Sequence, residues 1–168
     1  MADEQGTGSY KVPKNKVLVQ LKIPPSTPRW HTVFLSSCAE NHRGQETVSD
    51  LFNTPRAFLP LQREGGVMNV IRRDSIRWIL LREPEVCEWY YYEVREGAPQ
   101  SRIRFEFDDG ETLEGSVYCI GPAGEQRILD IVNMPGPFLA LDAGTALYLV
   151  NINHINIISF VEEPDGGP

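Results

Sequence analysis

Two pairs of polar residues are the first candidates for chemistry in this sequence. Asp50 and Asn53 stand three residues apart, and Asp130 and Asn133 repeat both residue types at the same spacing. Repeated carboxylates suggest two acid–base sites, but a general acid or base needs a partner within hydrogen-bond reach, and no repeated Glu, His or Lys accompanies them. We therefore expect a structural role, in which each Asp binds a nearby backbone N–H and each Asn caps a helix. The chain is not expected to be an enzyme.

The histidines and cysteines are scattered along the chain. They are His31, His42, His154, Cys38, Cys87 and Cys119. Their spacing is not that of a zinc site, and the sequence has no phosphate-binding glycine loop, so we predict neither a metal nor a cofactor. An odd number of cysteines without a C-x-x-C pair favours free thiols in a reduced, cytoplasmic setting.

Charge is distributed unevenly between the two halves of the sequence. Residues 1–84 carry 12 Lys/Arg and 8 Asp/Glu, net +4, whereas residues 85–168 carry 4 and 15, net −11. A nucleic-acid-binding surface is basic, so only the first half could supply one, through Arg72, Arg73 and Arg77. The asymmetry could equally favour head-to-tail contact between unlike halves of neighbouring molecules, or simply keep the protein soluble.

The polar pairs belong to a longer internal repeat. Three stretches align between the copies: 19–23 with 103–107, 48–61 with 128–141, and 71–76 with 150–155. In the central stretch six of fourteen pairs are identical. The offset between copies drifts from 84 to 79 within polar or glycine-bearing stretches, where surface loops tolerate changes in length. Such a duplicated unit constrains the architecture more strongly than any single motif.

The repeat divides the chain into five parts. These are a tail at 1–15, a first unit at 16–84, a bridging segment at 85–101, a second unit at 102–162 and a tail at 163–168. We expect both tails to be disordered. Each unit is near the lower size limit for an independent hydrophobic core. The two units are therefore expected to pack on each other or to associate with another chain.

Each unit has the pattern of a small β structure with one short helix. Alternation over 102–107 indicates a half-buried strand, and Asp109-Gly110 indicates a tight turn after it. Apolar residues at helix spacing over 128–132 predict two helical turns that end near Asn133. The order strand, strand, helix, strand, strand, strand is typical of a small barrel. The expected fold is mainly β: two tandem SH3- or Sm-like β-barrels, each with one inserted helix.

The bridging segment has no counterpart in the repeat. Its core is the aromatic run Trp89, Tyr90, Tyr91 and Tyr92, whose residue types favour a strand. Such a strand could close the first barrel or bridge the two units. It could also present aromatic anchors on an exposed edge to a protein partner, which makes the four residues candidates for partner binding.

One stretch of the second unit resembles Sm-like proteins. The run 104–117 has an alternating strand, a turn with Gly110 and a second glycine, Gly115, before the next strand, as in the first Sm motif. The run 149–155 loosely echoes the second Sm motif. The resemblance implies a small barrel. In Sm proteins the helix precedes the barrel, whereas here it lies within each unit, so no RNA-binding residue is carried over.

A second resemblance covers most of both units. The runs 127–141 and 150–155 resemble a family of small prokaryotic domains of unknown function, with the pattern R-(L/V)-S-D-x-L-N, then F-(L/I)-P-L, then V-N-x-x-H-I. The first unit matches at 48–53 and 58–61, but Ser75 stands where the second unit has His154. The resemblance implies a soluble bacterial or archaeal protein and brings no known activity.

The sequence therefore predicts a non-enzymatic protein–protein interaction module, an adaptor or assembly subunit of a cytoplasmic complex. It would bind a protein partner, or associate with itself, through exposed strand edges that can accept a further strand. RNA binding through the basic first unit is the alternative. No apolar run approaches the roughly 18 residues of a membrane helix, and the N-terminal residues lack the pattern of a signal peptide, so neither membrane insertion nor export is expected.

Overall fold

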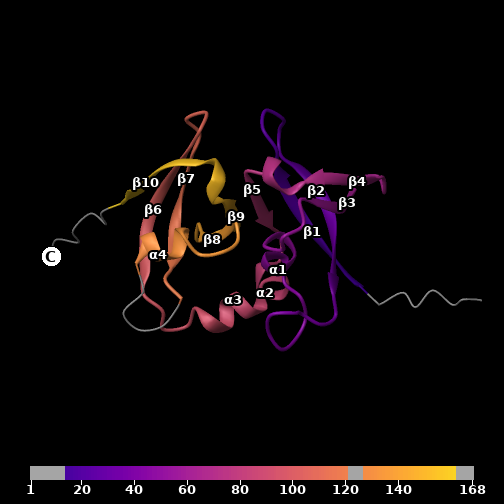
Figure 1. Ribbon diagram of the computed structural model, residues 1–168, viewed down its shortest axis with the longest axis horizontal. Helices are drawn as coiled ribbons and strands as arrows, with labels where there is room; N and C mark the ends of the chain where they lie inside the picture. The colour runs from indigo at the N-terminus through magenta and orange to yellow at the C-terminus, as the bar shows by residue number, and fades with distance from the viewer. Residues whose placement is uncertain (1–13, 121–126, 162–168) are drawn as a thin grey trace, which may run out of the picture.

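The computed structural model describes residues 14–120 and 127–161, which contain ten strands in one antiparallel sheet (Figure 1). The strands are β1 (Lys14–Lys22), β2 (Arg29–Ser36), β3 (Phe58–Arg63), β4 (Met68–Arg72), β5 (Trp78–Leu81), β6 (Gln100–Phe107), β7 (Thr112–Tyr118), β8 (Phe138–Asp142), β9 (Leu147–Asn151) and β10 (Ile155–Phe160). Their order in the sheet is β10-β6-β7-β8-β9-β5-β1-β2-β3-β4. The prediction of a mainly β fold is confirmed. The strands form one continuous sheet, not closed into a barrel, in place of the two separate barrels expected, because β5 pairs with β9.

Short helices connect the strands. In the described residues they are α1 (Val48–Phe52), α2 (Pro84–Cys87), α3 (Trp89–Val94) and α4 (Ile128–Val132), with single 3₁₀ turns at Arg73–Ser75 and Ile152–His154. The best-defined start is that of α1, where the Thr47 hydroxyl accepts from the Asp50 backbone N–H and the Asp50 carboxylate accepts from the Thr47 N–H. This reciprocal pair satisfies two backbone donors that a helix start leaves free.

The two halves of the sheet have the same internal order. The first half comprises β1 to β5 with α1, and the second comprises β6 to β10 with α4. The strands run β5-β1-β2-β3-β4 in the first half and β10-β6-β7-β8-β9 in the second. Helix α4 begins 80 residues after α1, and β9 begins 79 residues after β4, which are the offsets of the aligned sequences. Each strand of one half therefore has a counterpart at the same place in the other.

Each half has its own hydrophobic core. The first core collects the inward side chains of β1, β2, β3 and β5 around α1. The second collects those of β6 and β7 around α4. The alternation predicted for the strands is present: in β6, Ile103, Phe105 and Phe107 are buried. Gly115 in β7 permits close approach of the neighbouring strand, since a Cβ there would lie 2.6 Å from the backbone oxygen of Asp142.

The bridging segment is helical, so the strand predicted for its aromatic run is wrong. Pro84 occupies the first turn of α2, where its missing N–H and fixed φ are suited to a helix start. Cys87 at the end of α2 is buried in the first core, and Tyr91 of α3 packs against the same core. This packing outweighs the strand preference of aromatic residues. Helices α2 and α3 run along the lower side of the two halves in Figure 1.

The expected tails fall almost entirely outside the described residues. Lys14 and Asn15, which belong to the predicted N-terminal tail, instead begin β1 and pair with β2. The tail at 163–168 lies wholly outside them. Among the helices of the described residues, none has the length and apolar character needed to cross a membrane.

Candidate functional site

The aromatic residues of α3 do not form one exposed surface. Trp89 donates its indole N–H to the backbone oxygen of Gln45 at 3.1 Å. Tyr90 stacks on the His42 ring with 4.3 Å between centroids, and it is 39% exposed. Trp89 and Tyr90 therefore hold the loop before α1 in place, and only Tyr90 offers substantial aromatic surface to a partner.

Tyr91 and Tyr92 tie α3 to both halves of the sheet. Both pack against the first core. The Arg95 guanidinium lies 4.2 Å from the centre of the Tyr92 ring and donates to the Asp142 carboxylate of β8 at 2.7 Å. Burial raises the pKa of Tyr92 to about 12. These contacts belong to a structural clamp, and the partner-binding role predicted for the two tyrosines stays a prediction.

A histidine–carboxylate pair lies at the start of α1. His42 Nε2 is 2.6 Å from Asp50 Oδ2, and His42 Nδ1 is 3.3 Å from the backbone oxygen of Arg43. Burial lowers the pKa of His42, but the hydrogen bond to Asp50 and the Arg43 carbonyl outweigh it, so the net shift is upward. Both ring nitrogens face acceptors, so neither is free to activate a nucleophile. The pair holds Asp50 in its capping position.

Glu88 is buried beside this pair. Its carboxylate accepts the backbone N–H of Ser49 in the first turn of α1, and the residue is 1% exposed. Burial raises the pKa of Glu88 to about 7. The first turn of α1 therefore depends on two buried titratable side chains, one from the preceding loop and one from the bridging segment.

The three candidate arginines occupy different environments. The side chain of Arg77 is 1% exposed and lies in the contact between the halves. It donates to Asp108 at 2.9 Å, Asp109 at 2.8 Å and Glu111 at 2.7 Å, all from the turn between β6 and β7. Its guanidinium also lies 4.9 Å from the centre of the Phe107 ring. Arg77 is an internal link between the halves.

Arg72 and Arg73 do not extend Arg77 into a basic surface. Arg73 donates to the backbone oxygen of Thr54 and lies 3.6 Å from Asp74. Arg72 is exposed and lies over the Phe58 ring. The structure therefore leaves Arg72 as the exposed member of the three, while Arg77 is enclosed by acidic groups.

The repeated Asn residues have different partners in the two halves. Asn53 Nδ2 donates to the backbone oxygen of Phe138 at 3.1 Å, and the Phe138 N–H donates to Asn53 Oδ1 at 2.8 Å. Asn53 thus binds both backbone groups of a residue in the other half. Asn133 is exposed and, among the residues that the structure describes, its side chain donates to Leu129 of its own helix at 2.6 Å. Asp130 is also exposed.

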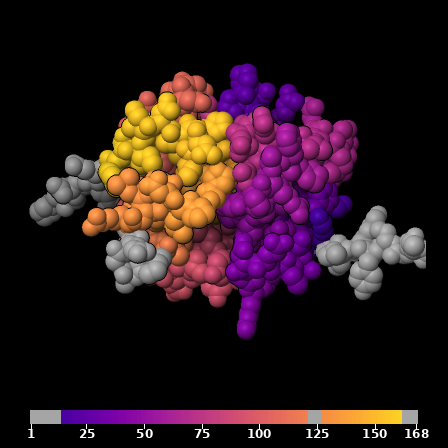
Figure 2. Space-filling model, in the orientation of Figure 1, coloured from indigo at the N-terminus to yellow at the C-terminus, as the bar shows by residue number. Residues whose placement is uncertain are grey.

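The contact between β5 and β9, here named the internal joint, exchanges side chains between the cores. Trp78 pairs with Val150 and Leu81 with Leu147 at the ends of the ladder. Buried side chains from the opposite half enter each core: Phe138, Leu147 and Leu149 join the first, and Trp78 joins the second. In Figure 2 the two halves meet along a continuous surface. The joint is therefore continuous with both cores.

A row of polar contacts continues the internal joint beyond the ladder. Asn151 is fully buried; its side chain donates to the backbone oxygen of Ile76 at 2.9 Å and its N–H to that of Arg77 at 2.8 Å. His154 Nε2 lies 2.6 Å from the backbone oxygen of Asp74. The Asn and His of the V-N-x-x-H-I pattern therefore bind the backbone of the first half, which sequence reasoning did not predict.

Strands β4 and β10, here named the free edges, are the ends of the sheet. Within residues 14–120 and 127–161, each pairs along one side only. Large apolar side chains are exposed on or beside both: Phe58 (52%), Met68 (52%) and Val70 (71%) near β4, with Ile157 (50%) and Phe160 (68%) on β10. Unpaired backbone groups flanked by apolar side chains are a template for a further strand. We identify the two free edges as the candidate functional site.

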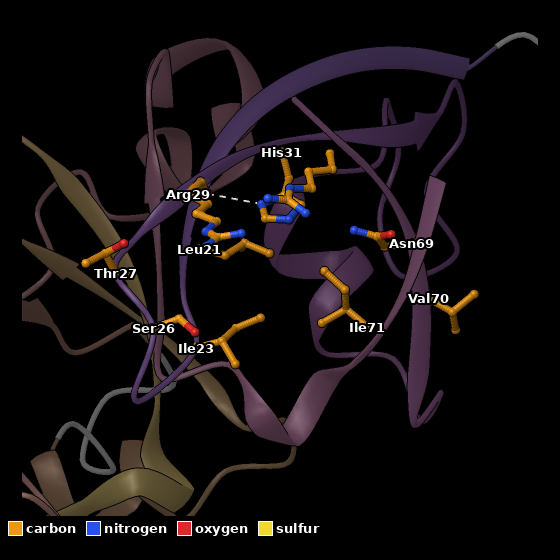
Figure 3. A pocket seen from close by; sticks show the side chains of 10 residues that line it. Leu21, Ile23, Ser26, Thr27, Arg29, His31, Asn69, Val70 and Ile71 are labelled. Carbon is orange, nitrogen blue, oxygen red and sulfur yellow. Dashed lines mark hydrogen bonds between the residues drawn. The ribbon is translucent and has the colours of Figure 1, made fainter. Parts of the chain in front are cut away.

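A hollow of about 370 Å³ lies beside β4 in the first half (Figure 3). Its apolar wall includes Leu21 of β1 and Ile23 just after that strand, with Val70 and Ile71 of β4. His31 also faces it, and burial lowers the pKa of that residue, so its ring is favoured in the neutral form. The hollow adjoins a free edge and is mainly apolar on one side, so it is suited to an apolar side chain.

The sequence did carry a signal for this site, because the exposed positions lie on strands predicted from the repeat. Which of them are exposed depends on the strand order, which no local pattern specifies. Within residues 14–120 and 127–161 no three His, Cys, Asp or Glu side chains gather as a possible metal site. In comparisons with known proteins, the chain matches no protein-family model, no curated protein and no solved structure.

Proposed function

We propose that this chain is a non-enzymatic assembly subunit that binds a protein partner through its free edges, β4 and β10. The observation that carries the proposal is the combination of unpaired strands at both ends of the sheet with exposed apolar side chains on each. A partner strand would satisfy the backbone donors and acceptors and cover these side chains at the same time.

The edge sequences support this proposal. Proteins usually protect edge strands with charged residues or proline. Strand β10 (INIISF) has neither, and β4 (MNVIR) has only Arg72 at its end. Single exposed apolar residues need no explanation, but apolar residues concentrated at unpaired backbone mark an interaction surface.

The same contacts favour a protein partner over RNA. Nucleic-acid affinity depends on several cations that can reach phosphates. Arg77 is enclosed by three carboxylates and Arg73 is directed to a backbone oxygen, so a phosphate contact by either would require breaking an internal one. Both ring nitrogens of His42 lie beside acceptors, so neither is free for catalysis.

The test compares partner retention by edge variants. The tagged chain and its Val70→Lys/Ile157→Lys variant are incubated with nuclease-treated lysate of the source organism, and the retained proteins are identified. Val86→Lys is the matched control, since Val86 is 66% exposed on α2, away from both edges. Loss of a protein in the double variant but not in the control supports the proposal. Equal retention by all three chains, or retention only without nuclease, contradicts it.

A further inference from the structure

We propose that the partner at the free edges is a second copy of this chain, with β4 of one molecule pairing with β10 of the next. The inference rests on the proposed function and names the partner. It extends a contact already present within the chain: β9 and β5 form the internal joint, and their counterparts in the opposite halves are β4 and β10. One molecule would thus repeat toward its neighbour the contact that its second half makes with its first.

The exposed side chains match the buried side chains of the internal joint one for one. Four buried residues cross that joint: Phe138, Leu147, Leu149 and Trp78. Their counterparts at offsets of 80 and 79 residues are Phe58, Met68, Val70 and Ile157. All four counterparts are large, apolar and at least half exposed. The free edges therefore carry the side chains of this joint without the partner that would bury them.

The hollow beside β4 matches the space that Trp78 fills in the internal joint. Trp78 packs in the second core with Phe105, Phe107 and Val150, and it contacts Tyr148 edge-on with 5.3 Å between ring centres. The counterparts of these four residues, Leu21, Ile23, Ile71 and Asn69, all line the hollow. The counterpart of Trp78 is Ile157 on β10. Ile157 of a neighbouring molecule is thus the side chain suited to the hollow.

The repeated Asn residues fit the same arrangement. Asn53 crosses the internal joint and binds both backbone groups of Phe138. In the joint between molecules, its counterpart Asn133 would bind the backbone of Phe58 in the next copy. Asn133 and Phe58 are both exposed in the single chain. Self-association thus gives Asn133 a partner outside its own helix, where the described residues of one chain give it a bond to Leu129.

The internal joint also specifies the register between molecules. Trp78 lies opposite Val150 and Leu80 opposite Tyr148. The same register places Ile157 opposite Ile71 and Ser159 opposite Asn69 of the neighbouring chain. The two edges differ, so the contact is head-to-tail and leads either to a closed ring or to a filament. It also brings a basic first half against an acidic second half, which favours association.

The first test uses edge variants of the purified full-length chain and measures mass by sedimentation. We expect the wild-type chain to exceed the monomer mass and to dissociate on dilution. Val70→Lys and Ile157→Lys should each be monomeric, because each blocks one edge. Their equimolar mixture should form a 1:1 dimer, since each variant retains the edge that the other lacks. Val86→Lys should behave as the wild type, and circular dichroism verifies the fold of every variant.

The second test checks the register by disulfide formation in a Cys38→Ser background, which removes the exposed native thiol. A chain with Asn69→Cys, mixed with a chain with Ser159→Cys, should give a covalent dimer on mild oxidation, because opposed residues on paired strands are within disulfide range. Replacing Ser159→Cys with Asn156→Cys moves the thiol about 10 Å along the strand and should reduce the yield at least tenfold.

The outcomes separate this inference from the proposed function. A wild-type chain that is monomeric at every concentration overturns self-association. So does a single-edge variant that still dimerises, because symmetric pairing of like edges would then be responsible. If the edge variants nevertheless lose a different protein from lysate, the edges remain the binding site and only the identity of the partner is wrong. If the edge variants lose neither self-association nor a protein retained from lysate, both proposals are wrong.

Discussion

The internal joint and the free edges consist of corresponding strands, β9 and β5 in the joint and β4 and β10 at the edges, but in the described residues only those of the joint pair with each other. In the joint, Leu147 and Leu149 are almost fully buried in the opposite core, whereas their counterparts Met68 and Val70 are among the most exposed apolar residues described. The strands, their order and the apolar character of the positions are the same. At these positions the joint supplies a neighbouring strand and the free edges do not, as expected if the edges bind a further strand.

One feature belongs to the internal joint alone. Arg77 is buried there and donates to three carboxylates of the turn between β6 and β7. Its counterpart on β10 is Asn156, and the counterparts of Asp108 and Asp109 are Pro24 and Pro25. A contact between molecules would therefore lack this ion-pair cluster. Together with the covalent connection through α2 and α3, the cluster should make the internal joint more stable than the contact that we propose between molecules, which should be reversible.

The largest expected difference is between Leu147→Ala and Met68→Ala. Leu147→Ala removes a buried side chain and should lower the free energy of unfolding by about 2–5 kcal/mol at every protein concentration. Met68→Ala should leave unfolding of the dilute chain within about 0.5 kcal/mol of wild type. At high concentration it should also lower the apparent stability, because it weakens an association that favours the folded state. Urea unfolding at a low and a high protein concentration measures the free energy of unfolding of both variants.

If Leu147→Ala and Met68→Ala lowered the free energy of unfolding equally in dilute solution, the predicted difference between the internal joint and the free edges would be wrong. Met68 would then be as important as Leu147 to the fold of one chain. The prediction would also be wrong if the effect of Leu147→Ala, and not that of Met68→Ala, depended on protein concentration. The internal joint would then not be intact in every molecule.

The repeat made much of the fold predictable. The short helix over 128–132 and the strands around it follow from apolar spacing and turn residues, and both are confirmed. The strand predicted for the aromatic run at 89–92 is wrong because strand preference depends on packing partners. Its tyrosines pack on the first core, whose position relative to the segment depends on how the strands join.

The site was less predictable than the fold. A sequence pattern shows that Val70 and Leu149 correspond, but not that one is exposed and the other buried. That difference follows from the order of ten strands, in which β9 has a neighbour on each side and β4 does not. The role of Asn53 was likewise inaccessible, because its partner Phe138 is 85 residues away along the chain.

In the first half α1 is held by His42, through Asp50, and by the buried Glu88, whereas Asp130 of α4, the counterpart of Asp50, is exposed. Burial raises the pKa of Glu88 from its ordinary 4.5 to about 7. The folded state therefore binds this proton more tightly, so its stabilising effect is complete below pH 4.5 and is lost as the pH rises through 7. The raised pKa of His42 acts in the same direction.

Glu88→Gln should remove most of this dependence. Glutamine can still accept the Ser49 N–H but does not ionise. Between pH 4.5 and pH 8 the stability of the variant relative to wild type should rise by about 1–3 kcal/mol, as the wild type loses its contribution. Asp130→Asn, at an exposed position of α4, serves as the matched acid-to-amide change. A relative stability of Glu88→Gln that is flat with pH would show that Glu88 ionises normally in the folded chain.

The smallest and most specific comparison is between Asn53→Ala and Asn133→Ala. Asn53→Ala leaves the partly buried N–H and C=O of Phe138 without their partners and should cost about 1–3 kcal/mol of folding stability. Asn133→Ala should change the stability of the dilute chain by less than about 0.5 kcal/mol, because Asn133 is exposed and contacts only its own helix. Its effect should appear in the dissociation constant between molecules, measured by sedimentation. If Asn133→Ala leaves that constant unchanged while Val70→Lys abolishes association, the strands pair between molecules as β5 and β9 do within one chain, but without a counterpart of the Asn53–Phe138 hydrogen bonds.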